Sequence, residues 1–244
     1  MCGRFELHTN PAAIALTFGL SQPPAIAPRY NIAPTQDVPV VRETRDGDRE
    51  LAQVRWGLVP RWAKDPSIGV RMINARAETL ADKPAFRNAL KWHRCLLPAD
   101  GFYEWKAVAG GKQPYRIGMK DGAVFALAGL TERWLSRDGE VLDTCAIVTT
   151  PANSLMGPLH DRMPLIIAPE DYARWLDRSI EDVADLLSPY PANAMSFHPV
   201  STRVNAVRND DASIIEPVEV APANEASAAP ADSEEELPTQ ASLF

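Results

Sequence analysis

Residues 94–106 read RCLLPADGFYEWK and contain two short β-rich runs, 94–98 and 102–106, with no helical pattern between them. Similar runs continue in both directions along the chain. They are VPVVR (38–42), LAQVRWG (51–57), PYRIGMK (114–120), AVFALAGL (123–130), VLDTCAIVTT (141–150) and MPLII (163–167). Because these runs follow one another without regular intervening helices, the sequence predicts a mainly antiparallel α+β domain rather than a βαβ layout.

A few short helices and turns are expected around these runs. The clearest helix has Asn10 as its N-cap, Pro11 at its first position and Gly19 just beyond its end. Three more helices are predicted at KPAFRNAL (83–90), APEDYARWL (168–176) and SIEDVADLLSPY (179–190), the last from a Ser179-to-Asp182 capping pattern. Two hairpin turns are predicted at Asp121-Gly122 and Asp138-Gly139.

The formal charge of −7 is unevenly distributed along the 244 residues. Residues 210–244 contain nine acidic residues and no Lys or Arg, which leaves 23 acidic residues against 25 basic ones in residues 1–209. The body therefore carries about +2 and can bind an anionic partner. From about Glu219 the chain is rich in Ala, Pro, Ser and Glu, a composition that predicts disorder. We expect a folded domain over 2–210 and an acidic, disordered tail over 211–244.

Several function classes lack support in the sequence. The chain contains no phosphate-binding glycine motif, no GxSxG elbow and no HExxH helix. Its three cysteines, Cys2, Cys95 and Cys145, are widely spaced, so neither a disulfide framework nor a metal site is predicted. Cys95 and Cys145 lie in apolar runs and are expected to be buried thiols. No signal peptide or membrane-spanning run is evident, so we expect a cytoplasmic protein.

Cys2 directly follows the initiator methionine. Its side chain is small, so methionine aminopeptidase is expected to remove Met1 and leave a free amine beside the thiol. The reference pKa values are about 7.7–8.0 for such an amine and about 8.5 for the thiol. With an aldehyde, the amine forms a Schiff base and the sulfur then closes a five-membered thiazolidine ring. Position alone nevertheless favours an incidental cysteine, because buried or inert cysteines are the commoner kind.

Eight short motifs carry a resemblance that changes this interpretation. In chain order they are MCGRF (1–5), RYNIAP (29–34), RWGLVPRWAKD (55–65), INARAET (73–79), RCLLPADGFYEWK (94–106), IVTT (147–150), HDRMP (160–164) and FHPVS (197–201). Together they resemble the SOS response-associated peptidase (SRAP) family over about residues 2–208. The acidic tail is not part of this pattern.

The resemblance implies a DNA repair protein of the SOS response. Such a protein senses abasic sites in single-stranded DNA at stalled replication forks and crosslinks itself to the ring-opened sugar through Cys2. The crosslink shields the lesion from strand cleavage. The resemblance also implies removal of Met1, with lyase and autopeptidase activity, and a compact β-barrel-like sheet with flanking short helices. It implies no cofactor and no metal, and we expect a monomer that joins the nucleoid when engaged on DNA.

Four residues match the family's catalytic positions: Cys2, Asn74, Glu104 and His160. From the residues alone, Glu104 is either an exposed edge charge or a poised carboxylate on the strand face that carries Phe102. The match favours a base that deprotonates the Cys2 amine. A lone histidine is more often structural, but the match makes His160 the acid at the sugar ring oxygen. Asn74 is expected to orient Cys2 or a sugar hydroxyl.

Five further residues are candidates for contact with DNA. Arg76 and Arg162 suit phosphate, although an exposed arginine is more often a solvated charge. Trp62 is either a loop anchor or a stacking platform for an unpaired base. Pro34 is expected to act as a small apolar wedge, and Thr149 to assist beside His160. Two other functions remain open: a cysteine hydrolase or peptidase that uses the Cys2 thiolate, and a non-catalytic reader of modified bases.

Overall fold

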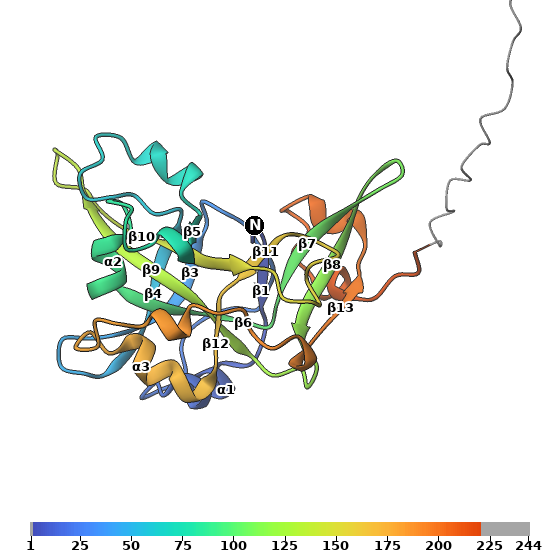
Figure 1. The fold of residues 1–244 in the computed structure, drawn as a ribbon, viewed down its shortest axis with the longest axis horizontal. Coiled ribbons are helices and arrows are strands. Elements are labelled where there is room, and N and C mark those ends of the chain that lie inside the picture. Colours follow the sequence, from blue (N-terminus) through green and yellow to red (C-terminus); the bar gives the residue numbers. More distant parts are fainter. Residues whose placement is uncertain (1, 221–244) are drawn as a thin grey trace, which may run out of the picture.

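The computed structural model describes residues 2–220, which form two β-sheets with short helices around them (Figure 1). The five-stranded sheet has the order β13 (Met195–Pro199), β8 (Gly111–Met119), β7 (Gly101–Val108), β1 (Phe5–Leu7) and β2 (Arg29–Ile32). The eight-stranded sheet has the order β11 (Arg162–Pro164), β10 (Val141–Pro151), β4 (Arg49–Trp56), β3 (Asp37–Glu43), β6 (Arg94–Ala99), β9 (Phe125–Leu135) and β12 (Ile166–Ile167), with β5 (Asn74–Arg76) paired to β10.

Five strands of the larger sheet close into a ring. β9 pairs with β10 over Val141↔Leu135 to Ile147↔Gly129, and this pairing closes the sequence β10–β4–β3–β6–β9. Most pairs are antiparallel, but β10 runs parallel to β4 and to β5. The structure therefore confirms the mixed α+β class and the β-barrel-like sheet that the resemblance implied.

All eight β-rich runs of the sequence lie in strands, but four short strands were not predicted. β1, β2, β5 and β13 have three to five residues, too few for a period-2 pattern to be recognised. The inner faces of both sheets share one apolar core, in which Phe5 of β1 packs edge-on against Trp56 of β4 with ring centroids 5.4 Å apart. Cys95 and Cys145 are buried free thiols, as expected.

The helices are short and largely follow their sequence signals. α1 (Pro11–Phe18) is capped by the Asn10 side chain, which accepts from the backbone N–H of Ala13, and Gly19 ends it in the left-handed conformation at φ 67°. α2 (Arg87–Trp92) begins later than the predicted Lys83, and α3 (Tyr172–Leu176) follows η3. No helix in the described part is long and apolar enough to cross a membrane. The 3₁₀ helices are η1 (Pro66–Arg71), η2 (Ala77–Thr79), η3 (Pro169–Asp171), η4 (Ala184–Leu186), η5 (Ala192–Ala194), η6 (Thr202–Asn205) and η7 (Ala212–Ile215).

Two local predictions are wrong. Residues 179–190 form only η4, because the Ser179 N–H and hydroxyl both donate to the Asp177 carboxylate, which draws Ser179 away from the predicted cap. Asp121-Gly122 joins β8 to β9, but these strands belong to different sheets, so the turn is a crossover and not a hairpin. The Asp138-Gly139 turn does join paired strands, β9 and β10.

The folded part extends beyond the boundary predicted at residue 210. The Asp210 carboxylate accepts from the backbone N–H groups of Tyr30 and Asn31, and Ile214 of η7 is fully buried. The Val218 N–H donates to the Pro199 carbonyl at 3.0 Å. Residues 211–218 thus pack against β2 and β13. Ile214 is buried there in a second, smaller core with Tyr103, Val200 and Val204. Residues 221–244 of the predicted tail lie outside the described residues.

A buried polar network joins β1, β7 and β8. Glu6 is fully buried; its carboxylate lies 2.6 Å from Arg116 Nε and accepts from the Tyr103 hydroxyl at 2.8 Å. His8 Nε2 lies 3.7 Å from Glu6 Oε1, and His8 Nδ1 lies 3.7 Å from Asp100 Oδ2. The Glu6 carboxylate raises the pKa of His8 above its ordinary value; Asp100 adds to this effect and burial opposes it.

This network predicts a pH-dependent stability. The protonated His8 is favoured in the folded state, so its contribution is complete below its unfolded pKa and is lost as the pH rises through its folded pKa. In His8→Phe, which keeps the stacking on Tyr30, this component should be absent. Urea denaturation between about pH 5.5 and 8.5 should show the wild type losing stability relative to the variant. Parallel pH profiles would contradict the assignment.

Candidate functional site

The register between β1 and β7 brings Glu104 to the N-terminal end of the chain. Phe5 pairs with Phe102 and Glu6 with Gly101, and the Tyr103 N–H donates to the Arg4 carbonyl at 2.9 Å. Continued by two residues, this antiparallel register sets Glu104 beside Gly3 and close to Cys2. Because side chains alternate along β7, Phe102 lies in the main apolar core and Tyr103 lies in the second, smaller core. Glu104 therefore points inward, and it is only 4% exposed.

Asn74 holds the main chain of Cys2. Its Nδ2 donates to the Cys2 carbonyl at 2.8 Å, across 72 residues of sequence. Asn74 is the first residue of β5, which β10 holds by parallel pairing of Asn74 with Ile147. The Asn74 Oδ1 atom is buried without a hydrogen-bond partner among the described residues. The site thus contains a fixed acceptor that a sugar hydroxyl or an amine could use.

Burial controls the two titratable groups at this point. It raises the pKa of Glu104 to about 7, and the charge of Asp161 adds to the shift. The Cys2 side chain is fully buried, and burial together with the nearby negative charge of Glu104 raises the pKa of its thiol to about 12. At neutral pH the thiol is therefore protonated, while the Glu104 carboxyl is available in both its protonated and ionised forms.

His160 lies just before β11, between a backbone donor and a carboxylate. The Arg162 N–H donates to His160 Nδ1 at 3.0 Å, which leaves the proton of the neutral ring on Nε2. Asp161 Oδ1 lies 2.7 Å from the same Nδ1 and would accept from it when the ring is protonated. Burial lowers the pKa of His160, so the neutral ring with an Nε2–H donor dominates at neutral pH.

Arg162 is already engaged. Its guanidinium binds both oxygens of Glu78 at 2.8 and 3.0 Å and donates to the Thr149 carbonyl at 2.7 Å. Thr149 is fully buried on β10, and its hydroxyl also accepts from Arg162. Thr149 therefore lies beneath Arg162 and not at the surface. Arg162 can take a phosphate only by releasing Glu78.

Arg76 and Trp62 are the accessible candidates. Arg76 ends β5 opposite Thr149 and is exposed. Trp62 is 59% exposed and, with residues 63–65, 67–68 and 71–72, surrounds a hollow of about 500 Å³. The loop that carries Trp62 closes where Gly57 meets Gly69, since a Cβ on Gly69 would lie 2.6 Å from the Gly57 carbonyl oxygen. Figure 1 shows this segment, in blue-green, standing above the ring.

Pro34 lies on a strained turn between β2 and β3. The next residue, Thr35, has φ 72°, a conformation that is a clear outlier for a β-branched residue. Three bonds hold the turn: Thr35 N–H to the Trp56 carbonyl at 2.8 Å, Trp56 N–H to the Gln36 carbonyl at 2.9 Å, and Ala33 N–H to Gln36 Oε1 at 3.0 Å. Pro34 is half-buried on this separate segment.

The structure thus places seven of the nine predicted residues in two groups, on or next to strands of the two sheets. Cys2, Asn74 and Glu104 form one group, and Arg76, Thr149 and Arg162 form a second one on β5, β10 and β11, with His160 next to it. Glu78 and Asp161 were missed, although both lie inside the motifs INARAET and HDRMP. In the sequence, Glu78 lies two residues after Arg76, and Asp161 lies next to His160. Such spacings are too common in proteins to identify a functional residue.

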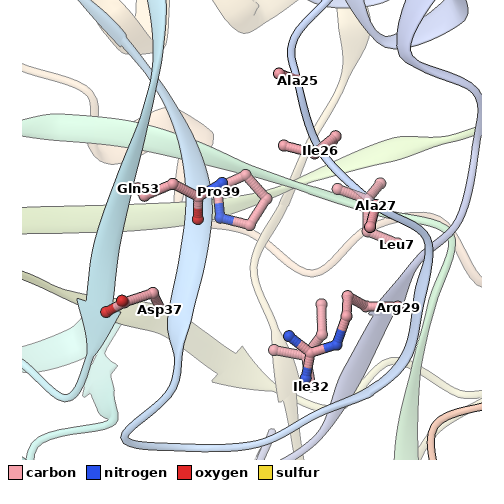
Figure 2. A pocket seen from close by; sticks show the side chains of 9 residues that line it. All are labelled: Leu7, Ala25, Ile26, Ala27, Arg29, Ile32, Asp37, Pro39 and Gln53. Carbon is pink, nitrogen blue, oxygen red and sulfur yellow. The ribbon is translucent and has the colours of Figure 1, made fainter.

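Other hollows lie apart from this group. The hollow in Figure 2, about 210 Å³, is bounded by β1–β4 and the segment before β2, and none of the predicted site residues lines it. Arg29 borders it but is bound to Asp210 and Gln36. Among residues 2–220, no three His, Cys, Asp or Glu side chains lie close enough together to hold a metal ion.

Comparison with known proteins gives consistent matches. Abasic site processing protein YoqW of Bacillus subtilis is 44% identical over 223 residues, covering 88% of this chain and 99% of that protein. Abasic site processing protein YedK of Escherichia coli is 34% identical, covering 89% of this chain and all of that protein. A crystal structure of a Bacteroides thetaiotaomicron protein superposes with a TM-score of 0.81 at 27% identity, covering 89% of this chain and all of that one. A family model, SOS response associated peptidase (SRAP), matches residues 1–207, and the chain therefore belongs to this family.

Proposed function

We propose that this protein senses abasic sites in single-stranded DNA and, after removal of Met1, forms a covalent thiazolidine crosslink through Cys2 that shields the lesion from strand cleavage. The names of its relatives support a role in abasic-site processing. The observation that carries the finer proposal is the Glu104 carboxyl, buried beside Cys2 with its pKa raised to about 7. Such a group can both accept and return a proton at neutral pH.

The proposed reaction uses the two nucleophiles of Cys2 in turn. The free amine attacks the sugar aldehyde, and Glu104 takes the proton that the nitrogen loses as the C–N bond forms. Glu104 returns this proton to the former aldehyde oxygen, which gives the carbinolamine. The second nitrogen proton is then transferred through Glu104 to the carbinolamine hydroxyl, which leaves as water and gives the imine. The Cys2 sulfur then bonds to the imine carbon, and the thiol proton moves to the nitrogen. A thiol with a pKa raised to about 12 retains that proton until this last step.

The other residues act on the sugar and the strand. In its protonated form, with Asp161 beside Nδ1, His160 donates from Nε2 to the sugar ring oxygen while the anomeric hydroxyl loses its proton to water, and the hemiacetal opens to the aldehyde. Asn74 fixes the Cys2 carbonyl and offers its Oδ1 to the substrate. Arg76 binds a phosphate, and Trp62 stacks on a base, which is worth about 1–3 kcal/mol. Pro34 contacts a neighbouring base as an apolar wedge. Arg162 borders the same strand, and the buried Thr149 holds its guanidinium from below.

The hydrolase alternative requires a Cys2 thiolate at neutral pH. Burial and the charge of Glu104 both oppose ionisation of that thiol, so the structure offers this alternative no support. A non-catalytic reader would not need Cys2. Acetylation of the Cys2 amine distinguishes these functions, because it blocks imine formation but leaves the fold and the thiol intact.

The first prediction concerns the sulfur. Cys2→Ser keeps the amine after Met1 removal but cannot close the thiazolidine ring, so no heat-stable crosslink to abasic single-stranded DNA should appear on a denaturing gel. Borohydride should still trap the imine, which would show that the site is intact. Cys95→Ala, which removes a buried thiol elsewhere, should crosslink normally. A heat-stable adduct of Cys2→Ser at the wild-type level would rule out the thiazolidine.

The second prediction separates the acid from the base. His160→Ala should slow crosslinking to a natural abasic site by about 10²-fold and recover with a permanently open aldehyde analogue. Glu104→Gln should stay slow with both substrates, because its proton transfers follow ring opening. His198→Gln serves as the control, since His198 bonds the Ile215 carbonyl away from Cys2. Rescue of both variants by the open aldehyde, or of neither, would show that these roles are wrongly assigned.

The third prediction concerns the two arginines. Arg76→Ala should flatten the log–log salt dependence of binding to undamaged single-stranded DNA by about 0.7, the value for one neutralised phosphate. Arg162→Ala should change that slope little, because a phosphate that replaces Glu78 frees a carboxylate and adds no net neutralisation. It should instead lower stability by about 1–2 kcal/mol through lost hydrogen bonds to Thr149. A larger slope change for Arg162→Ala would reverse the two assignments.

A further inference from the structure

A second polar cavity, of about 630 Å³, lies at the far end of the ring from Cys2. Its walls come from the β3–β4 hairpin, the β9–β10 hairpin, the end of α2 and the segment after α3. In Figure 1 these elements gather on the left of the view, whereas β1 lies at the centre. Arg61 lines this cavity, and its neighbour Trp62 lines the hollow of the proposed DNA-binding face. A continuous strand could therefore pass from one to the other.

The lining of the cavity is rich in arginine. Six guanidinium groups face four carboxylates: Arg42, Arg45, Arg61, Arg94, Arg133 and Arg178 against Glu43, Glu50, Glu132 and Asp143. Three carboxylates are already used. Asp143 accepts from Nε and Nη2 of Arg133 at 2.7 and 2.8 Å, Glu50 accepts from Arg42 at 2.7 Å, and Glu132 lies 3.8 Å from Arg61 Nε. The remaining lining keeps an excess of positive charge.

Two of these arginines are held by neutral groups. Arg94 is 3% exposed and donates only to main-chain carbonyls, including those of Trp175 and Leu90. Arg178 donates to the carbonyls of Glu43 and Thr44. Within residues 2–220 neither forms an ion pair with a carboxylate. Carbonyl dipoles fix these guanidinium groups without cancelling their charge, so the cavity is pre-organised for an anion.

The cavity also contains a buried hydroxyl and, at its rim, a partly exposed aromatic side chain, Trp92, over whose ring Lys91 Nζ lies 4.8 Å from the centroid. The Thr44 hydroxyl is buried without a hydrogen-bond partner in the described part of the chain. Such a group costs free energy in the absence of a ligand and suits a phosphate oxygen. Trp92 at the rim is 43% exposed. The pKa of His93 is lowered by burial and then by Arg61, Arg178 and Arg42, which shows how closely these charges converge.

We propose that this cavity binds phosphate groups of the single strand that flanks the proposed lesion site, with Trp92 as a stacking platform at its rim. The choice of DNA as the ligand rests on the proposed function; the binding of a phosphate-like anion does not. The cavity would extend the footprint of the protein along the strand and add affinity that does not depend on the lesion.

The test compares oligothymidylates without abasic sites, about 8 and about 30 nucleotides long, by fluorescence anisotropy. Arg45→Glu should weaken binding of the long strand about tenfold at low salt and leave the short strand unchanged. Arg45 is exposed with no ion pair among the described residues, so folding should be unaffected. Lys120→Glu makes the same charge change at an exposed position outside the cavity and should alter binding of the long strand less than about twofold. Equal effects of the two variants would overturn the proposal.

Thr44→Val provides a second test that separates binding from stability. Removing an unpartnered buried hydroxyl should leave the melting temperature unchanged or raise it. It should nevertheless weaken binding of the long strand several-fold. Inorganic phosphate should raise the melting temperature of the wild type more than that of Thr44→Val. Stabilisation by phosphate without any effect on the long strand would overturn the DNA assignment. Loss of crosslinking in every protein, with the Arg45→Glu effect intact, would refute the proposed function and support this cavity as a binding site.

Discussion

The pairing of a three-residue strand is the constraint on which the rest of this structure depends. β1 lies between β7 and β2, and its few backbone bonds fix the chain end that carries Cys2. So short a strand cannot stabilise itself. It is held by the buried Glu6 carboxylate, which bonds Arg116 and Tyr103, and by Phe5, which packs on Trp56 in the ring. A chain terminus, usually the least ordered part of a protein, is thereby made a fixed reference point for the site.

Near Cys2, burial prepares two groups for proton transfer, whereas it makes a third group, Glu6, a structural link between strands. The Glu104 carboxyl and the Cys2 thiol lose hydration, which raises both pKa values and keeps protons available near neutral pH. Glu6, buried just as completely, gains a guanidinium and a hydroxyl as partners and serves to join strands. The difference lies in the balance of terms. At Glu6 a guanidinium and a hydroxyl compensate the buried carboxylate, whereas at Glu104 the cost of burial outweighs the backbone hydrogen bond from Trp105 and leaves the carboxyl able to exchange a proton.

The arginines divide in a similar way. Arg162 is bound to Glu78 and supports Thr149, Arg94 and Arg178 are held by backbone carbonyls, and Arg76 projects into solvent. These environments determine which guanidinium groups can contact a phosphate directly. A count of basic residues, about +2 for the body, conveys none of this, because affinity for a polyanion depends on where uncompensated charge gathers.

The sequence by itself determined the longer strands, the first helix, the strand face that Glu104 shares with Phe102, and the membership of most site residues in one set of motifs. These features follow from local patterns: period-2 alternation, an Asn-Pro cap, and short runs of letters in a fixed order. Only the tertiary structure decided that β9 and β10 close a ring, that Asp121-Gly122 crosses between sheets, and that Asn74 reaches the Cys2 carbonyl. The physical reason is that register, ring closure and ion-pair partners such as Glu78 with Arg162 join residues far apart in the chain. Their free energies depend on packing that no local window of sequence contains.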